Sequence, residues 1–403
     1  MIKQRTASEF LAIPILLLSL FLLQDIAHAQ VILGQSCAMS GPTAFLGKEM
    51  NRGAKAYFDK HAKDISLRRM DDRYEPERCV ENTKKLLREG VSALFGYVGT
   101  PTSKKAVPLA MAKDTVFFGA FTGAGFLSNV RINPYAFSLR ASYDAEIENM
   151  VKRLKEDLGV RKIGLFVQRD AFGLAGVRGA VRAVKKIGEV KIVPPIPEIP
   201  RESASKEKWD AFWKMVPNYR RNTIAVGQSA RKLSGSRQAE AVILVGAYRP
   251  CAEAIRLWKK VNFDAMFVNI SFVGAKALAL MLGENVRNVL ISQVVPNPWD
   301  PRIPIVREYQ NTLGGKDYGF VSLEGYMAAK AMHKAIQNAG KEVSSKQLRK
   351  SLESMSGADI GGLTVSFGPD DHRGLDAVYL TRIEAKAGGN AVEFKYIDKI
   401  TKE

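Results

Sequence analysis

The sequence has few of the residues from which metal centres and disulfide frameworks are built. Its 403 residues include 3 cysteines and 4 histidines, and neither type shows a CxxC pair or the spacing of a zinc site. The cysteines are Cys37, Cys79 and Cys251. We therefore expect no metal centre and no cofactor.

Motifs of common α/β enzymes are also missing. The sequence contains no GxxxxGK[ST] phosphate-binding run and no GxSxG nucleophile elbow. No nucleophile, base and orienting residue occur at a recognisable spacing. Arg169 and Asp170 could form a catalytic pair, but an ion pair within a loop explains them more simply. We therefore expect a protein that is not an enzyme.

The long hydrophobic run at the N-terminus has the pattern of a signal peptide. Lys3 and Arg5 precede an apolar run from Leu11 to Leu23, which leads to Ala27-His28-Ala29. This run is shorter than the roughly 20 residues that a membrane helix needs. We expect cleavage after Ala29 and a periplasmic protein, with an uncleaved anchor as the alternative.

Positive charge is in excess, with 60 Lys and Arg against 41 Asp and Glu and a formal net charge of +19. Such a balance can indicate a nucleic-acid partner. Here, however, the basic residues are spread over helical patterns such as Val151 to Gly159, without a long basic run. We expect no nucleic acid, and a basic surface that can steer an anionic solute.

Short apolar strands alternate with helical patterns along the chain, which predicts mostly parallel sheets with helices on both faces. One set of such units begins with the strand Val31 to Gln35, and a second set begins after Arg140. Residues 194–237 are predicted as an edge connection with an irregular helix around Trp209 to Val216, and Pro296 to Pro304 as part of a loop. Because the chain exceeds the about 250 to 300 residues of a single core, we expect two α/β lobes.

The loops that follow the strands share glycines, hydroxyl groups and single aromatic residues, and ligands of parallel sheets bind beyond the carboxyl ends of the strands. Thr100 and Thr122 are the best candidates for binding a carboxylate, although Thr100 could simply cap the next helix. Phe172 and Tyr248 are candidate apolar walls, with ordinary packing as the alternative.

Further possible ligand contacts are Leu46 and Tyr97. Leu46 follows the turn that contains Ser40 and Gly41, and a hydrophobic staple on the next helix would also explain it. Tyr97 opens the YVGTPT loop that contains Thr100.

Several of these segments together resemble the leucine/isoleucine/valine-binding protein family of periplasmic receptors. They are GQSCAMSGPTAFLG, DDRYEPERCVENTKKLL, ALFGYVGTPTSKKAVPLA, FTGAGFL and QRDAFGLAGV. The resemblance covers nearly all of the chain after the signal peptide. It implies a type I periplasmic binding fold, in which two lobes joined by three crossing strands close on the ligand.

Placed on this sequence, the resemblance divides the chain into two lobes. The expected crossings are Arg140 to Ser142, Ser292 to Val295 and Gly361 to Phe367. Lobe 1 would contain residues 30–140 and 294–361, and lobe 2 residues 143–292 and 365–403.

The resemblance also places ligand contacts on particular residues. The carboxylate-binding hydroxyl falls on Thr100, and the donors of the next loop fall on Thr122, Gly123 and Ala124. The covering aromatic residue falls on Phe172, and a tyrosine position falls on Tyr248.

Ser271 stands where amino-acid binders of this family have an acidic residue for the α-ammonium group. A buried ammonium would therefore lack its partner, which costs several kcal/mol. A net-negative organic acid fits slightly better than an amino acid, unless Asp170, Asp144 or Glu324 turns into the cleft.

The resemblance implies a monomeric receptor that delivers a carboxylate-bearing solute, such as an amino acid, an amide or an organic acid, to the permease and ATPase of an ABC transporter. A sensory receptor for a signalling partner is the alternative. Cys37 and Cys79 would lie on neighbouring elements of such a fold, as a disulfide or as two buried thiols.

Overall fold

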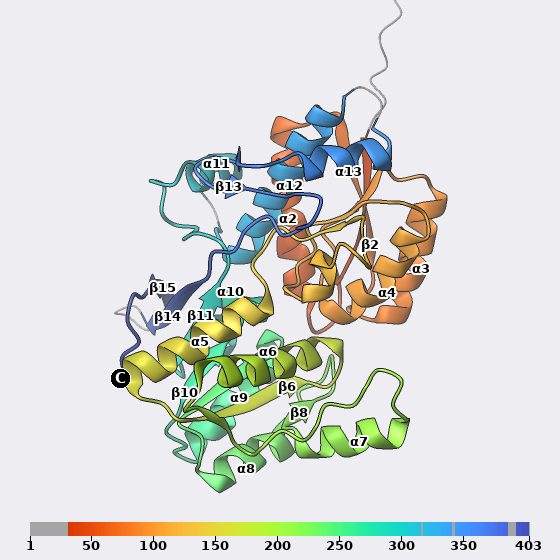
Figure 1. Cartoon of the computed structure of the whole chain (residues 1–403). Helices are drawn as coiled ribbons and strands as arrows, with labels where there is room; N and C mark the ends of the chain where they lie inside the picture. The colour runs from red at the N-terminus through yellow and green to blue at the C-terminus, as the bar shows by residue number, and fades with distance from the viewer. Residues whose placement is uncertain (1–30, 316, 341–342, 386–391, 403) are drawn as a thin grey trace, which may run out of the picture.

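The computed structural model describes residues 31–315, 317–340, 343–385 and 392–402 and shows two α/β lobes (Figure 1). The predicted signal peptide, residues 1–29, lies outside the described residues. Within the described ranges, no helix has both the length and the apolar character needed to span a bilayer.

The first lobe is built on a parallel sheet with the strand order β2-β1-β3-β4-β5. Its strands are β1 (Val31–Cys37), β2 (Ile65–Asp71), β3 (Ala93–Phe95), β4 (Phe117–Phe118) and β5 (Ala136–Phe137). The central strands β1, β3 and β4 are largely apolar and buried, as expected for a sheet covered on both faces.

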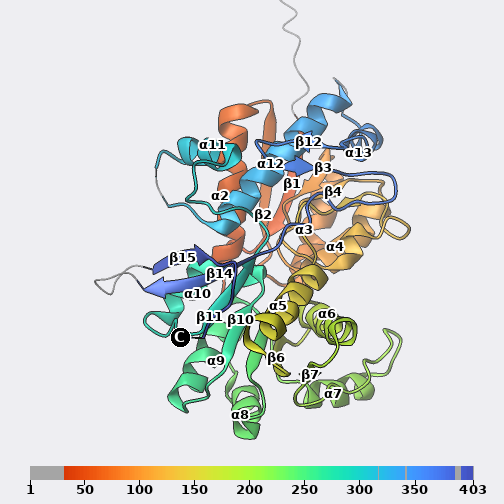
Figure 2. The same ribbon diagram turned by 60° about the vertical axis from the view of Figure 1, so that its left-hand side comes forward.

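Helices cover both faces of this sheet (Figure 2). One face carries α3 (Pro76–Arg88) and α4 (Thr100–Met111), and the other carries α2 (Ala44–His61) and α12 (Phe320–Ala339). Two further helices of the lobe are α11 (Pro304–Leu313) and α13 (Ser345–Glu353). The first lobe therefore combines the start of the described chain with a late segment, seen in Figure 1 as red to orange next to blue.

The second lobe is built on a mixed sheet with the order β15-β14-β11-β10-β9-β6-β7, and β8 pairs with β6. Its parallel strands are β6 (Lys162–Gln168), β7 (Lys191–Ile192), β8 (Asn218–Tyr219), β9 (Ala241–Val245), β10 (Met266–Asn269) and β11 (Val289–Gln293). The strands β14 (Tyr379–Ala385) and β15 (Val392–Tyr396) extend it in the antiparallel direction.

The helices of the second lobe also lie on both faces of its sheet. Two of them, α5 (Tyr143–Leu158) and α6 (Ala171–Ile187), pack against each other and face the first lobe. The others are α7 (Lys206–Met215), α8 (Gly227–Ser236), α9 (Tyr248–Lys260) and α10 (Ala275–Leu282).

The chain passes between the lobes near Arg140 and after β11, where two of the crossings were expected. It returns to the second sheet at Tyr379, the start of β14, which is later than the expected crossing at Gly361 to Phe367. That segment packs on the first lobe, because Phe367 contacts Phe118 and Phe137 at ring-centroid distances of 6.0 and 5.6 Å. Its strand β13 (Thr364–Val365) pairs with β12 (Ala358–Asp359).

The structure confirms the predicted α/β architecture with two mostly parallel sheets. The helix predicted around Trp209 to Val216 is confirmed as α7. The connection around it also contains α8, and the loop predicted at Pro296 to Pro304 includes the start of α11, so these two predictions were incomplete. Pro304 is the first residue of α11, a position where proline removes no helical hydrogen bond.

Candidate functional site

Three helices begin at the same place between the lobes. Their first residues are Thr100 of α4, Tyr143 of α5 and Ala171 of α6. All three residues line one cavity of about 470 Å³. The cavity therefore lies at the positive ends of three helix dipoles, where backbone N–H groups favour an anion.

Of the two predicted hydroxyl residues, Thr100 lines the inner end of the cavity, and Thr122 is fully buried next to it. The Thr100 and Thr122 hydroxyl oxygens lie 2.8 Å apart in a hydrogen bond. The Ala124 N–H donates to the Thr122 hydroxyl at 3.3 Å, and Gly123 and Ala124 line the cavity. A Cβ on residue 123 would come within 2.8 Å of Tyr143, so only glycine allows this close approach.

Thr100 does not cap α4. The N-cap residue is Gly99, which has φ of 100°, and the helix start has no side-chain cap. By contrast, Ser142 caps α5 through the Ala145 N–H, and the Asp170 carboxylate caps α6 through the Phe172 N–H. The N-terminus of α4 is thus the one of these three that is left open to a ligand.

Tyr143 is a cavity residue that the sequence reasoning missed. Its hydroxyl is buried beside the hydroxyls of Thr100 and Thr122 but makes no hydrogen bond of good geometry with the described residues. Burial raises the pKa of Tyr143 to about 12, although the charge of Arg140 and the two threonine hydroxyls lower it. A buried phenol with an unmet hydrogen bond is a ready partner for a ligand oxygen.

Phe172 lies behind Tyr143 in a buried aromatic cluster between the lobes. Its ring centroid is 5.4 Å from that of Tyr143 and 4.5 Å from that of Phe272. Phe272 in turn contacts Phe121 at 5.3 Å and Tyr74 at 6.0 Å, both from the first lobe. Phe272 therefore fills the interface, and its position after a buried strand was its main sequence signal.

A carboxylate does lie next to Ser271, and it belongs to Glu146 of α5. The Ser271 N–H and hydroxyl donate to the Glu146 carboxylate at 2.8 and 2.9 Å. Arg140 lies 3.4 Å from both Glu146 and Glu324, and it also donates to the Ser271 hydroxyl. The acidic group comes from a different element, so no local motif near Ser271 could have indicated it.

This charged cluster is fully enclosed. Arg140 is 1% exposed, its guanidinium lies 4.9 Å from the ring centroid of Phe121, and its Nε makes no hydrogen bond with the described residues. Burial raises the pKa of Glu324 to about 7, with Arg140 lowering it and Glu146 raising it further. Glu324 thus titrates near neutral pH.

The other two carboxylates considered for an ammonium group are already engaged. Asp170 caps α6 and accepts a hydrogen bond from Gln168 at 2.7 Å. Asp144 lines the cavity but pairs with Arg182 at 2.6 Å.

The remaining predicted contacts lie away from this cavity. Tyr248 packs edge-on against Phe45 across the lobe interface at 6.0 Å, and burial raises its pKa. Leu46 is buried against Gly274. A Cβ added to Gly274 would lie 2.5 Å from the Leu46 side chain. Tyr97 is buried on the α3 and α4 face of the first sheet, with its hydroxyl 3.1 Å from that of Thr83.

Cys37 and Cys79 form no disulfide, so the predicted possibility of a bridge is corrected to buried free thiols. The Cys37 sulfur lies 3.9 Å from the Gly47 carbonyl, and the Cys79 sulfur lies 3.7 Å from the Thr102 carbonyl. The two side chains thus point towards different backbone groups. Burial raises the pKa of both thiols.

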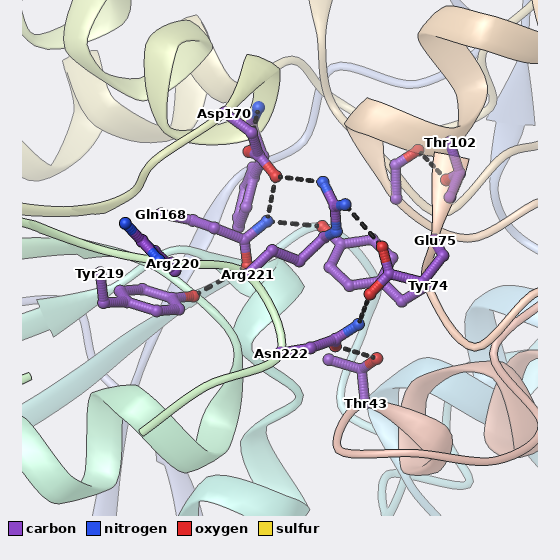
Figure 3. A network of polar contacts seen from close by, with 12 residues as sticks. Thr43, Tyr74, Glu75, Thr102, Gln168, Asp170, Tyr219, Arg220, Arg221 and Asn222 are labelled. Carbon is purple, nitrogen blue, oxygen red and sulfur yellow. Dashed lines mark hydrogen bonds and ion pairs between the residues drawn. The ribbon is translucent and has the colours of Figure 1, made fainter. Parts of the chain in front are cut away.

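A polar bridge joins the lobes beside the cavity (Figure 3). Arg221 of the second lobe lies between Asp170 of its own lobe, at 3.3 Å, and Glu75 of the first lobe, at 2.7 Å. Asn222 also donates to Glu75 at 2.7 Å, and Gln168 donates to the Tyr74 hydroxyl at 3.2 Å. The described structure is therefore a closed arrangement of the two lobes.

Comparison with known proteins agrees with this architecture. A family model described as periplasmic binding protein matches residues 30–198 and 219–390. The structure of a possible leucine/isoleucine/valine-binding protein from Rhodopirellula baltica SH 1 is 34% identical, with a TM-score of 0.78, and the match covers 91% of this chain and 97% of that one. No curated protein matches the chain.

Two further structures extend the comparison. A substrate-binding periplasmic protein from Ralstonia solanacearum is 26% identical, with a TM-score of 0.76 and coverage of 91% of this chain and 100% of that one. A branched chain amino acid ABC transporter from Thermus thermophilus with bound valine is 17% identical, with a TM-score of 0.72 and coverage of 93% and 97%, which shows a shared fold. The chain therefore belongs to the periplasmic binding proteins of the leucine/isoleucine/valine-binding protein family and has their type I fold.

Proposed function

We propose that this solute-binding receptor holds a small carboxylate-bearing molecule in the interlobe cavity and delivers it to the permease and ATPase of an ABC transporter. The main support for a carboxylate ligand comes from the inner end of the cavity. There the uncapped start of α4 meets the paired hydroxyls of Thr100 and Thr122 and the unmet hydroxyl of Tyr143. These groups can donate hydrogen bonds, and a ligand carboxylate can accept them.

The same groups favour delivery of the solute over its chemical conversion. None of them is a nucleophile paired with a base, and a receptor needs only to hold its solute and release it. The valine-bound relative from Thermus thermophilus is itself described as part of an ABC transporter. The N-terminal pattern at residues 1–29 supports export to the periplasm, with cleavage after Ala29.

Within carboxylates, we favour organic acids over α-amino acids. Glu146, Asp170 and Asp144 each already pair with an arginine or with backbone N–H groups. A ligand ammonium would therefore have to break an existing contact. Titration of branched-chain amino acids beside their 2-oxo analogues separates the two classes, and tight binding of the amino acids alone would contradict this preference.

The carboxylate site is tested by Thr100→Ala and Thr122→Ala. Each variant removes a hydroxyl donor, and a hydrogen bond to a charged group contributes about 1.5 to 3 kcal/mol, so the affinity for a carboxylate ligand should fall at least about tenfold. Calorimetry measures the affinity, and circular dichroism checks the fold.

Thr115→Ala is the matched control, because this buried hydroxyl bonds to the Lys113 carbonyl beyond the far end of α4. Its ligand affinity should remain unchanged. Equal affinities in Thr100→Ala, Thr122→Ala and the wild type would show that the carboxylate does not bind here.

A further inference from the structure

The cavity is elongated along two helices that face each other across the lobes. From α4 it is lined by Thr100, Lys104, Val107 and Pro108, and from α6 by Ala171, Leu174, Ala175, Arg178 and Arg182. These spacings of three and four residues mark one face of each helix. At about 1.5 Å per residue, the distance along α6 from Ala171 to Arg178 is about 10 Å.

The middle of the cavity is apolar. Val107 of α4 and Leu174 of α6 are 1% and 8% exposed, and Ala175 and Phe126 complete the walls. A volume of about 470 Å³ lies in the range of about 300 to 1,000 Å³ that is typical for ligands well above the size of a branched-chain amino acid. The shape therefore suits a solute with an extended hydrocarbon body.

The outer end of the cavity has one positive charge in surplus. Lys104 pairs with Glu202 at 2.8 Å and Arg182 pairs with Asp144 at 2.6 Å. Arg178 also lines the cavity and forms no direct ion pair or hydrogen bond with the residues that the structure describes. Among those residues, the only carboxylate that its charge is seen to act on is Glu202, whose pKa is lowered mainly by Lys104 and in smaller part by Arg178, so two cations share this one acid. Its guanidinium, partly buried two helical turns from the inner end, is available to a second anion.

We propose that the solute is an elongated dianion, with a carboxylate at Thr100 and a second acidic group at Arg178, joined by an apolar spacer. This inference rests on the proposed function, since it takes the inner end of the cavity as the carboxylate site. It adds a second point of recognition and a required distance between the two acids.

Two homologous series test this proposal on the full mature protein. Straight-chain monocarboxylates and α,ω-dicarboxylates of increasing length are titrated by calorimetry. The dicarboxylate whose acids lie about 10 Å apart should bind best, and at least about tenfold more tightly than the monocarboxylate of the same length.

Arg178→Gln should remove this advantage, so that the dicarboxylate binds no more tightly than the monocarboxylate of the same length. Arg178→Glu should bind an ω-amino carboxylate of that length better than the dicarboxylate, because the sign of the outer end is reversed. The matched control is Lys185→Gln, which removes a positive charge from an exposed position of the same helix outside the cavity lining and should keep the preference for the dicarboxylate.

The outcomes separate this inference from the proposed function. Monocarboxylate binding that depends on Thr100 but shows no preference for dicarboxylates, or a preference that survives in Arg178→Gln, overturns the dianion alone. A lack of binding in both series, or binding unaffected by Thr100→Ala, overturns the carboxylate site and the dianion together.

Discussion

At the scale of single residues, the main feature is a charged cluster enclosed at the junction of the lobes. Arg140 lies where the chain leaves the first lobe, Glu324 belongs to α12 of the first lobe, and Glu146 belongs to α5 of the second. One guanidinium therefore links both lobes next to a crossing. Removing one partner of a buried ion pair leaves the other charge unpaired, which usually destabilises a protein more than replacing the whole pair by apolar side chains.

Glu324 should give this protein a pH-dependent stability around neutrality. Its pKa in the folded chain, about 7, lies above the ordinary value of 4.5, so the folded state holds the proton more tightly than the unfolded state. The stability that Glu324 contributes through this tighter proton binding is fully present below pH 4.5 and is lost as the pH rises through 7. We expect the free energy of unfolding to fall over this window by up to about 3 kcal/mol.

Urea unfolding at several pH values measures this effect in the wild type and in Glu324→Gln. The variant lacks the titrating group, so its stability should change less between pH 4.5 and 7. Glu81→Gln, at an exposed position of α3, serves as the control and should follow the wild-type profile. Parallel profiles for the wild type and Glu324→Gln would contradict the assignment.

The sequence predicted one side of the cavity better than the other. Thr100, Gly123 and Ala124 follow strands of the first sheet directly, and strand ends meet at a common edge. Tyr143 and Glu146 occur inside a helical pattern after the crossing, where nothing local distinguishes a residue that faces the other lobe from one that packs in its own. Their roles arise from how the lobes meet.

At the scale of elements, the sequence patterns of buried strands and of helices were sufficient to predict the secondary structure of most of the chain. The helical pattern at Pro76 to Arg88 forms α3, and the apolar run at Ala241 to Val245 forms β9, in line with the predicted alternation of strands and helices. Short helices such as α8 and α10 were missed. Glycine and serine in α8 give a weak helical propensity that its packing on α9 overrides.

The contact between α2 and α12 depends on two glycines at the helix interface. A Cβ on Gly53 would come within 1.7 Å of the Ser322 carbonyl oxygen, and one on Gly325 within 2.2 Å of the Met50 carbonyl oxygen. Backbone atoms cannot turn aside, so Gly53→Ala should push the helices apart and lower the free energy of unfolding by about 1 to 3 kcal/mol.

Gly235→Ala is the matched control for this prediction. A Cβ at this position in α8 meets no atom within 4 Å, so the substitution should be neutral or raise stability by up to about 1 kcal/mol. Chemical denaturation compares the two variants. A Gly53→Ala protein as stable as Gly235→Ala would mean that α2 and α12 do not approach each other this closely.

At the scale of the whole molecule, the two lobes are held in the closed arrangement by packing and by polar bridges of different kinds. The aromatic cluster around Phe272 and the contact of Tyr248 with Phe45 give apolar closure. The bridge from Arg221 and Asn222 to Glu75 adds charge at the rim (Figure 3). A solute that contacts both lobes has all of its contacts only in this closed arrangement, so its affinity depends on the equilibrium between open and closed lobes.

The Glu75 bridge should therefore influence the equilibrium between open and closed lobes. Glu75→Gln weakens its contacts with Arg221 and Asn222, which exist only when the lobes meet. Because the Glu75 side chain is 38% exposed, we expect the closed state to lose no more than about 1 kcal/mol. That limit corresponds to at most about a fivefold weaker affinity for a solute that binds the closed state, because the affinity scales with the fraction of closed molecules.

Two measurements on Glu75→Gln test this expectation. Small-angle scattering should show a larger radius of gyration for the solute-free variant than for the wild type, and calorimetry should show the weaker affinity. Glu89→Gln is the control, because its ion pair with Arg68, at 3.0 Å, lies within the first lobe. If Glu75→Gln and Glu89→Gln behave alike in both measurements, the Glu75 bridge does not hold the lobes together, and closure depends on the other contacts between them.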